Sequence, residues 1–434
     1  MYRLINNLFS FINNKSPILF QSPGRNSFGN GSEEIFFGLL KAQKENKKVL
    51  FLYPRLKLFG RSFSLANREL FHLRSDHLVS NDSLLSIIGG CFLSIYIMIL
   101  WIIDWFRNLI IFKFINSKDK AVNHGYIVSQ IGRKDLWKPY GAKTFSWNLV
   151  YNLKWQEQFE NYIPPKISID KNIEAEKIRI KMGIPISDWF VCIHVGEQNP
   201  PTPRNASIEN YIETIKYITR TGGWVVRIGD SSMTPLPKMD KVIDFSHSLF
   251  KSELMDLYLI NECRFFIGLG SGPTFVATLF DKPQVLVNMN DWSMGVPLKK
   301  GGLVLIKHVF SKSKNKFLSV KEILNEPYDV TVFGKSSKEY ILYENTPEEI
   351  RTAIEEYILN LDKIKFSTLQ KKFNRNREEA IDRWINSGEP KWYGVPTREI
   401  YLNQYRIASR KEIEGTMSNK YLEENWEIDN YKIK

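Results

Sequence analysis

The stretch from Gly222 to Asn288 decides the fold of this chain. It reads GGWVVRIGD (222–230), KVIDFS (241–246), KSELMDLYLINEC (251–263), RFFIGLGSGPTFVATLF (264–280) and QVLVN (284–288). Short β-branched and aromatic runs alternate with helical runs, and glycine-rich or polar turns separate them. This alternation predicts βαβ units with a parallel sheet. Ligands of such sheets bind at the carboxyl ends of the strands, so we expect the functional site there.

Neighbouring runs extend the pattern in both directions. WFVCIHV (189–195) precedes the stretch and LVLI (303–306) follows it, which gives six strands and predicts a complete doubly wound sheet. Nearer the N-terminus, strands at 17–20 and 48–54 flank a helix at 34–44 and predict another βαβ unit. Pro164-Pro165 lies in a polar run typical of a linker. We therefore expect an α/β chain with domains at 1–165 and 173–365 and a charged helical extension at 366–434.

Composition and charge limit the classes of ligand and surface that the chain is expected to bind. The 434 residues are 43% hydrophobic and 25% charged, with a net charge of +13, which suits phosphorylated ligands or an anionic membrane surface. No nucleic-acid-binding motif accompanies the charge. The three cysteines, Cys91, Cys192 and Cys263, lie in apolar runs without metal-ligand spacing, as expected of core residues in a reducing compartment. The N-terminal segment lacks the features of a secretory signal, so we expect a cytoplasmic protein.

A hydrophobic segment at 84–112 leaves three interpretations open. Residues 84–103 carry no charge, and the apolar character continues past two charged residues to 112, which is long enough for a membrane span. A span would split the N-terminal domain across a bilayer, and a buried core helix would need a larger domain around it. We favour a membrane-associating helix that lies in the bilayer plane and presents Tyr96, Trp101 and Trp105 to the interface.

The loop from Gly268 to Thr274 is the best candidate for anion binding. Glycines such as Gly270 and Gly272 let the backbone approach a ligand, and Pro273 suits the first turn of a helix. The N-terminus of that helix would point at a phosphate, with Ser271 and Thr274 as hydroxyl donors. The alternative is a tight turn without a ligand.

Charged residues near the same strand ends add to this site. Arg227 lies among apolar neighbours, where it either pairs with Asp230 or Asp244 or binds a diphosphate through both guanidinium nitrogens. Lys251 and Ser252 at a helix start either contact phosphate or, in the case of Ser252, cap the helix.

The strand at 189–195 and the loop after it contain two candidate general bases. His194 ends the strand directly before a polar loop, and Glu197 follows three residues later. A structural histidine is the alternative for His194. No metal-ligand motif appears, and Glu34 replaces the third glycine of a dinucleotide fingerprint near Gly29 and Gly31, so neither a metal nor a nicotinamide cofactor is expected.

Several segments resemble a family of bacterial glycosyltransferases with the GT-B architecture. They are HV (194–195), RNASIENY (204–211), residues 222–276 and YENTPEEI (343–350). The resemblance is strong over 190–360 and weak over 25–405. Its most specific blocks are RIGDSSM (227–233) and FFIGLGSG (265–272).

The resemblance implies two doubly wound Rossmann-like domains that face a cleft, with a nucleotide-sugar donor held mainly by the C-terminal one. By position, it implies a donor site made by Arg204, Asn205, Arg227, Asp230, Ser252, Asp256, Gly270, Ser271 and Gly272. Relatives usually have arginine and aspartate directly after His-Val, where this chain has Gly196 and Glu197. If that arginine neutralises the leaving diphosphate, its role falls to Arg204 or Arg227, or activity is reduced.

Residues and resemblance together predict a metal-independent glycosyltransferase. It would move a hexose or related sugar from a nucleotide-diphosphate donor, its co-substrate, to a lipid-linked or cell-surface polysaccharide such as lipopolysaccharide. Expected partners are the donor, the glycan acceptor and the inner face of the cytoplasmic membrane, without a cofactor or nucleic acid. A nucleotide-sugar epimerase of the same architecture is one alternative. A non-catalytic membrane-associated subunit that binds glycan or nucleotide is the other, and Gly196 favours it.

Overall fold

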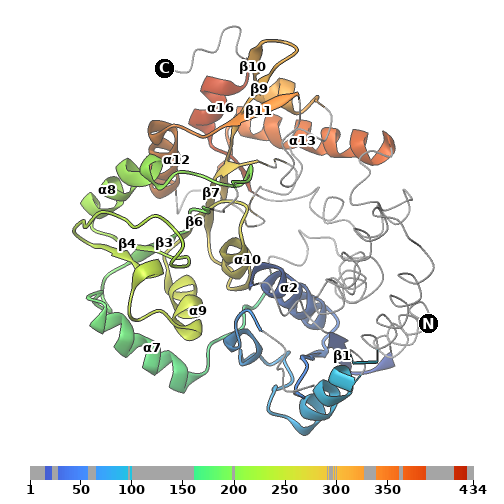
Figure 1. Cartoon of the computed structure of the whole chain (residues 1–434). Coiled ribbons are helices and arrows are strands. Elements are labelled where there is room, and N and C mark those ends of the chain that lie inside the picture. Colours follow the sequence, from blue (N-terminus) through green and yellow to red (C-terminus); the bar gives the residue numbers. More distant parts are fainter. Residues whose placement is uncertain are drawn as a thin grey trace, which may run out of the picture. The chain divides into compact units, whose positions relative to one another are not determined.

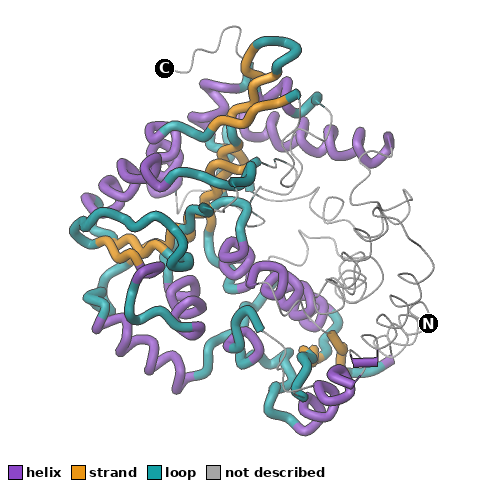
Figure 2. Tube along the Cα trace, in the orientation of Figure 1, coloured by secondary structure: helices purple, strands orange, loops and turns teal. Residues whose placement is uncertain are grey.

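The structure is a computed structural model, and it divides the chain into two compact units. Unit 1 contains residues 1–154 and 161–168, and unit 2 contains residues 155–160 and 169–434. The described residues are 15–21, 28–56, 65–95, 98–99, 161–197, 201–290, 292, 297, 299, 301–326, 339–360, 365–387 and 415–427. Figures 1 and 2 show the elements of both units.

Unit 1 contains the expected βαβ unit. Strand β1 (Ile18–Gln21) pairs in parallel with β2 (Lys48–Phe51), and helix α2 (Phe28–Lys44) connects them. A Cβ atom at Gly38 would come within 2.9 Å of the Phe51 ring, so this glycine allows the helix to approach the strand. Helix α2 begins six residues earlier than the sequence suggested, and the glycines near residue 30 therefore form its first turn. The short 3₁₀ helix η1 (Glu69–Phe71) follows.

The hydrophobic segment begins as a helix in unit 1. Residues 84–95 and 98–99 are helical, whereas 96–97 and 100–112 lie outside the described residues. Within the described part of the chain, no helix combines the length and the apolar character needed to cross a bilayer.

Unit 2 is built on a seven-stranded parallel sheet in the order β12-β8-β7-β6-β3-β4-β5. Its strands are β3 (Phe190–Ile193), β4 (Trp224–Arg227), β5 (Val242–Asp244), β6 (Phe266–Gly268), β7 (Gln284–Met289), β8 (Leu303–Ile306) and β12 (Thr416–Met417). The six strands predicted from the sequence are confirmed. Counted along the chain from β3, they lie in the order 3-2-1-4-5-6 of a doubly wound sheet.

Helices cover both faces of this sheet (Figure 1). On one side, α9 contacts both α7 and α10; on the other, α12 contacts both α8 and α16. Their bounds are α7 (Ile169–Lys181), α8 (Ile212–Arg220), α9 (Glu253–Glu262), α10 (Gly272–Leu279), α12 (Pro347–Leu359) and α16 (Asn419–Asn425). The predicted cap at Ser252 is confirmed, since Ser252 accepts a hydrogen bond from an N–H of α9; Thr346 forms a capping box with Glu349 at the start of α12. Ser207 caps the 3₁₀ turn η3 (Ile208–Tyr211) that precedes α8.

The C-terminal part of the chain belongs to unit 2 where it is described. Strand β12 pairs with β8 at the sheet edge, and α13 (Thr368–Ser387) contacts both β12 and α16. A second, antiparallel sheet has the order β10-β9-β11. Its strands and the remaining short helices are β9 (His308–Ser311), β10 (Lys316–Leu318), β11 (Tyr340–Tyr343), η4 (Phe245–His247) and α11 (Val320–Ile323). The sequence did not indicate β12 or this second sheet.

Two buried asparagines connect the sheet to α12. The backbone N–H of Asn288 donates to Asn345 Oδ1 at 2.7 Å, and the N–H of Asn345 donates to Asn288 Oδ1 at 2.6 Å. Asn345 Nδ2 also donates to the Ile306 carbonyl at 2.8 Å. Asn288 has a φ of 55°, a left-handed conformation that asparagine tolerates, at an irregularity in β7.

Replacing Asn345 should therefore destabilise unit 2. Asn345→Ala leaves buried backbone groups without partners, and we expect the free energy of unfolding to fall by about 2–3 kcal/mol. Chemical denaturation measures this change. Asn360→Ala, at an exposed helix end, is the control and should change stability by less than about 0.5 kcal/mol. Equal effects of the two substitutions would contradict the structural role of Asn345.

Candidate functional site

The topology of the sheet in unit 2 defines a switch point in the strand order. From β3 the chain adds β4 and β5 on one side and then crosses to β6 on the other side of β3. The carboxyl ends of β3 and β6 therefore border the switch point, where doubly wound sheets bind ligands. His194 follows β3 and Ser271 lies three residues past β6, and His194 Nδ1 and Ser271 Oγ are 2.9 Å apart. The structure thus brings together two of the predicted site residues.

His194 is held neutral at this position. Burial, the Arg227 guanidinium and Lys251 lower its pKa to about 4, although Asp230 acts in the opposite direction. A base with so low a pKa takes up a proton poorly near pH 7. Its electrostatics favour a positioning role toward Ser271, and the catalytic role of His194 stays a prediction.

The N-terminus of α10 lies at the same switch point, because the helix follows β6. Ser271 is its N-cap residue but makes no side-chain hydrogen bond to the helix, because its hydroxyl contacts His194 instead. The first turn of α10 therefore lacks a side-chain cap, as is typical of helix ends that receive an anion. The Thr274 hydroxyl donates to the Leu269 carbonyl at 2.6 Å, so it stabilises the loop internally.

Two glycines of this loop differ in their surroundings. A Cβ atom at Gly268 would overlap the Phe266 ring at 2.4 Å, so the fold requires this glycine. At Gly270 a Cβ atom would make only ordinary contacts, at 3.5 Å from Met289 and 3.9 Å from Arg204 Cδ. The Arg204 side chain passes next to Gly270, within van der Waals distance of a Cβ atom placed there.

Arg227 is fully buried and lies in a network of carboxylates. Its guanidinium donates to the Thr234 carbonyl and to Glu197 Oε1 at 3.4 Å, and it lies 3.6 Å from Asp244 Oδ2. Glu197 Oε2 in turn accepts from the Thr234 N–H at 2.7 Å. Of the two interpretations of Arg227, the structure favours pairing with carboxylates. Glu197, predicted as a base, has both oxygens engaged in this pairing.

The two aspartates near Arg227 have local partners. Burial alone would raise the pKa of Asp244, but hydrogen bonds from Ser246 and the Leu236 N–H, together with Arg227, lower it. Asp244 also lies 3.2 Å from His247 Nδ1. Asp230 accepts from the hydroxyl and N–H of Ser232, which lower its pKa. Asp230 therefore stabilises its own turn.

The residues predicted at the start of α9 also have internal partners. Lys251 Nζ lies 3.0 Å from Asp256 Oδ1 and 5.2 Å from the centre of the Phe245 ring. Burial raises the pKa of Asp256, and Lys251 partly offsets this effect. Ser252 accepts from the Met255 N–H at 3.2 Å and so acts as a cap.

Arg204 differs from these residues because its guanidinium is not paired. Its Nε is buried without a hydrogen-bond partner, and none of the described carboxylates forms an ion pair with it. The loop that carries it is fixed, since Asn205 Oδ1 accepts from Thr202 and Lys307 Nζ donates to the Asn205 carbonyl at 2.5 Å. Burial lowers the pKa of Lys307. The sequence analysis did not identify Lys307. A single lysine between two apolar strands could have indicated it.

Comparisons with known proteins give distant likenesses. No family model and no curated protein matches the chain. A family 9 glycosyl transferase from Veillonella parvula shares 12% identity over 76% of this chain and 94% of its own, with a TM-score of 0.36. The ADP-heptose lipopolysaccharide heptosyltransferase II of E. coli shares 10% identity over 62% of this chain and 83% of its own, with a TM-score of 0.30. At these TM-scores the likeness decides neither fold nor activity.

The side chains described at the site do not resemble the ligands of a metal centre. Within the described residues, no three histidine, cysteine, aspartate or glutamate side chains gather as metal ligands would.

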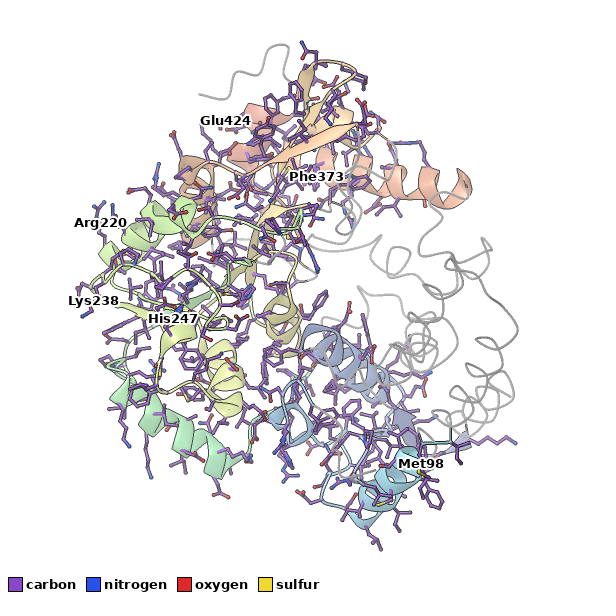
Figure 3. All side chains as sticks on the ribbon, in the orientation of Figure 1. Met98, Arg220, Lys238, His247, Phe373 and Glu424 are labelled. Atoms are coloured by element: carbon purple, nitrogen blue, oxygen red, sulfur yellow. The ribbon has the colours of Figure 1, made fainter. Side chains whose placement is uncertain are left out.

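Removing Arg227 should destabilise unit 2. In Arg227→Ala, Glu197 and Asp244 lose the cation that compensates their partial burial, and we expect a loss of about 3 kcal/mol or more in unfolding free energy. Arg220→Ala is the control, because Arg220 is exposed on the outside of the unit (Figure 3) and should change stability little. Urea denaturation compares the variants. A stable Arg227→Ala protein would contradict the structural role of the network.

The low pKa of His194 should make the folded protein less stable as the pH falls. In the unfolded chain, the His194 imidazole takes up a proton as the pH falls through its ordinary pKa near 6.5. In the folded chain it does so only near pH 4, where its lowered pKa lies. Stability is therefore lost as the pH falls through this window, by up to about 3 kcal/mol. His194→Gln should lose less stability than the wild type between about pH 7.5 and pH 4.5. The control Arg220→Gln, at an exposed side chain, should follow the wild type, and parallel curves for all three would contradict the assignment.

Proposed function

We propose that this chain is a glycosyltransferase that binds a nucleotide-diphosphate sugar at the crevice between β3 and β6. Its two units would correspond to the Rossmann-like domains of a GT-B enzyme, with the donor held by unit 2. The acceptor would be a lipid-linked or cell-surface polysaccharide, and transfer would need no metal. The residue resemblance over 190–360 supports the class, and the strand order supports the position of the donor.

The unpaired guanidinium of Arg204 beside Gly270 carries this proposal. A partly buried cation without a carboxylate is costly unless a ligand supplies the negative charge. Here the cation passes beside Gly270 and lies near an α10 N-terminus that has no side-chain cap. Both features suit a diphosphate, which a guanidinium binds through paired hydrogen bonds.

Arg204 would also supply the electrostatic part of the chemistry. When the glycosidic bond to the donor breaks, negative charge develops on the departing diphosphate, and preorganised positive groups stabilise it. Arg227 is already paired with two carboxylates, so it is poorly placed for this role. Arg204 would therefore replace the arginine that relatives carry at the position of Gly196.

A non-catalytic binding subunit is the second candidate function. The engagement of both Glu197 oxygens and the low basicity of His194 favour it, because neither residue is then a ready base for an acceptor hydroxyl. Such a subunit would bind the donor without hydrolysing it or transferring its sugar. Incubation with the bound nucleotide sugar, with and without bacterial lipid-linked glycans, separates the two functions.

Replacing Arg204 should weaken nucleotide-diphosphate binding without unfolding the chain. Loss of charge-assisted hydrogen bonds worth about 1.5–3 kcal/mol predicts a Kd that rises about 10- to 100-fold in Arg204→Gln. A thermal-shift screen of UDP-, GDP-, CMP- and ADP-sugars identifies the donor, and calorimetry then measures its Kd.

Arg220→Gln is the matched control and should bind like the wild type. Unchanged affinity in Arg204→Gln would exclude Arg204 from the site. Absence of binding by the wild type to every nucleotide sugar in the screen would exclude the proposed function itself.

A further inference from the structure

The helix at residues 84–95 of unit 1 packs with its small polar side inward. Ser86 is 1% exposed and Ser94 is fully buried. Ser94 Oγ accepts from the N–H groups of Arg55 and Leu56 at 2.9 and 3.1 Å, and Ser86 Oγ accepts from Arg55 Nη2 at 3.2 Å. A Cβ atom at Gly90 would come within 2.7 Å of the Tyr53 carbonyl oxygen, so the helix backbone lies directly against the chain.

The opposite side of this helix is large, apolar and exposed. Leu84 is 72% exposed and Phe92 is 68% exposed. With Ile88 and Ile95 they follow the three- and four-residue spacing of one helix face, and Ile99 continues it. Figure 3 labels Met98 in this segment. We call Leu84, Leu85, Ile87, Ile88, Phe92, Ile95 and Ile99 the apolar face; each is at least 40% exposed.

This arrangement is the reverse of a helix on a water-soluble protein. Such a helix buries its apolar side and exposes its polar side, because apolar burial is the main favourable contribution to folding. Contiguous apolar patches on protein surfaces usually mark interaction sites. The apolar face therefore needs an environment other than water.

We propose that the apolar face docks on a lipid bilayer, with the helix lying in the plane of the interface. Small residues at four-residue spacing, here Ser86, Gly90 and Ser94, are typical of helices that pack closely within a membrane, where the outward side meets lipid. Amphipathic helices of this kind bury their apolar side at the boundary between headgroups and acyl chains.

Charge favours a bilayer over a second copy of the chain. Residues 1–168 contain about twice as many basic as acidic side chains and carry most of the net charge of +13. Two such units repel each other, whereas an anionic lipid surface attracts them. The inference depends on the packing of this helix and holds whether or not the chain transfers a sugar.

Vesicle binding by the full-length protein tests this inference. We expect co-sedimentation with vesicles of phosphatidylcholine and phosphatidylglycerol mixed about three to one, and weaker binding to phosphatidylcholine alone. The double variant Ile88→Gln/Phe92→Gln changes only exposed positions and should keep the wild-type melting temperature. Its affinity for the anionic vesicles should fall at least about tenfold.

The chain offers a matched control for exposed apolar residues. Leu249 and Leu359 of unit 2 are 102% and 72% exposed, and Leu249→Gln/Leu359→Gln should bind vesicles like the wild type. Equal vesicle affinity of the wild type and Ile88→Gln/Phe92→Gln would overturn the proposal, as would failure of the wild type to bind either vesicle. If the wild type forms a dimer and does not bind vesicles, and the variant Ile88→Gln/Phe92→Gln is a monomer, the apolar face is instead a contact with a second copy of the chain. Analytical ultracentrifugation without lipid detects that outcome.

Discussion

The buried guanidinium of Arg227 is the constraint on which the site in unit 2 depends. A charge that is removed from water must be paired, and Glu197 and Asp244 provide this pairing from the segments after β3 and at the end of β5. The network thereby fixes three strand ends together. Its positive charge also contributes to the low pKa of His194, which contacts Ser271 across the switch point. One buried cation thus influences residues on both sides of the switch point.

Two arginines of the same site have different environments. The difference favours a structural role for one and a ligand-binding role for the other. Arg227 pairs with Glu197 and Asp244, whereas none of the described carboxylates forms an ion pair with Arg204, whose side chain passes beside Gly270. Lys307 Nζ donates to the carbonyl of Asn205, the residue after Arg204, and so holds the backbone there. An uncompensated cation on a backbone held in this way suits an anionic ligand.

The fold of unit 2 was largely predictable because its central strands are buried on both faces. Such strands appear in a sequence as continuous apolar runs, and VCI (191–193) and VLV (285–287) are examples. The two-residue strand β12 has no such pattern and was missed. The partners of Arg227 were only partly predictable, because Glu197 lies 30 positions away along the chain. From the sequence alone, the hydroxyl group of Thr274 could bind a loop carbonyl or a ligand; the backbone conformation decides for the Leu269 carbonyl.

The hydrophobic segment shows the same limit of sequence reasoning in unit 1. Its composition indicated an unusual environment, but an almost uniformly apolar run does not reveal which side faces the protein. The packing reveals it, because Arg55 and the backbone at Leu56 need hydroxyl acceptors and Ser94 provides them. Satisfying those buried donors places the serines inward and therefore turns the residues of the apolar face outward. The exposed apolar face is thus a direct consequence of hydrogen bonding inside unit 1, and the chain retains it at the cost of apolar contact with water.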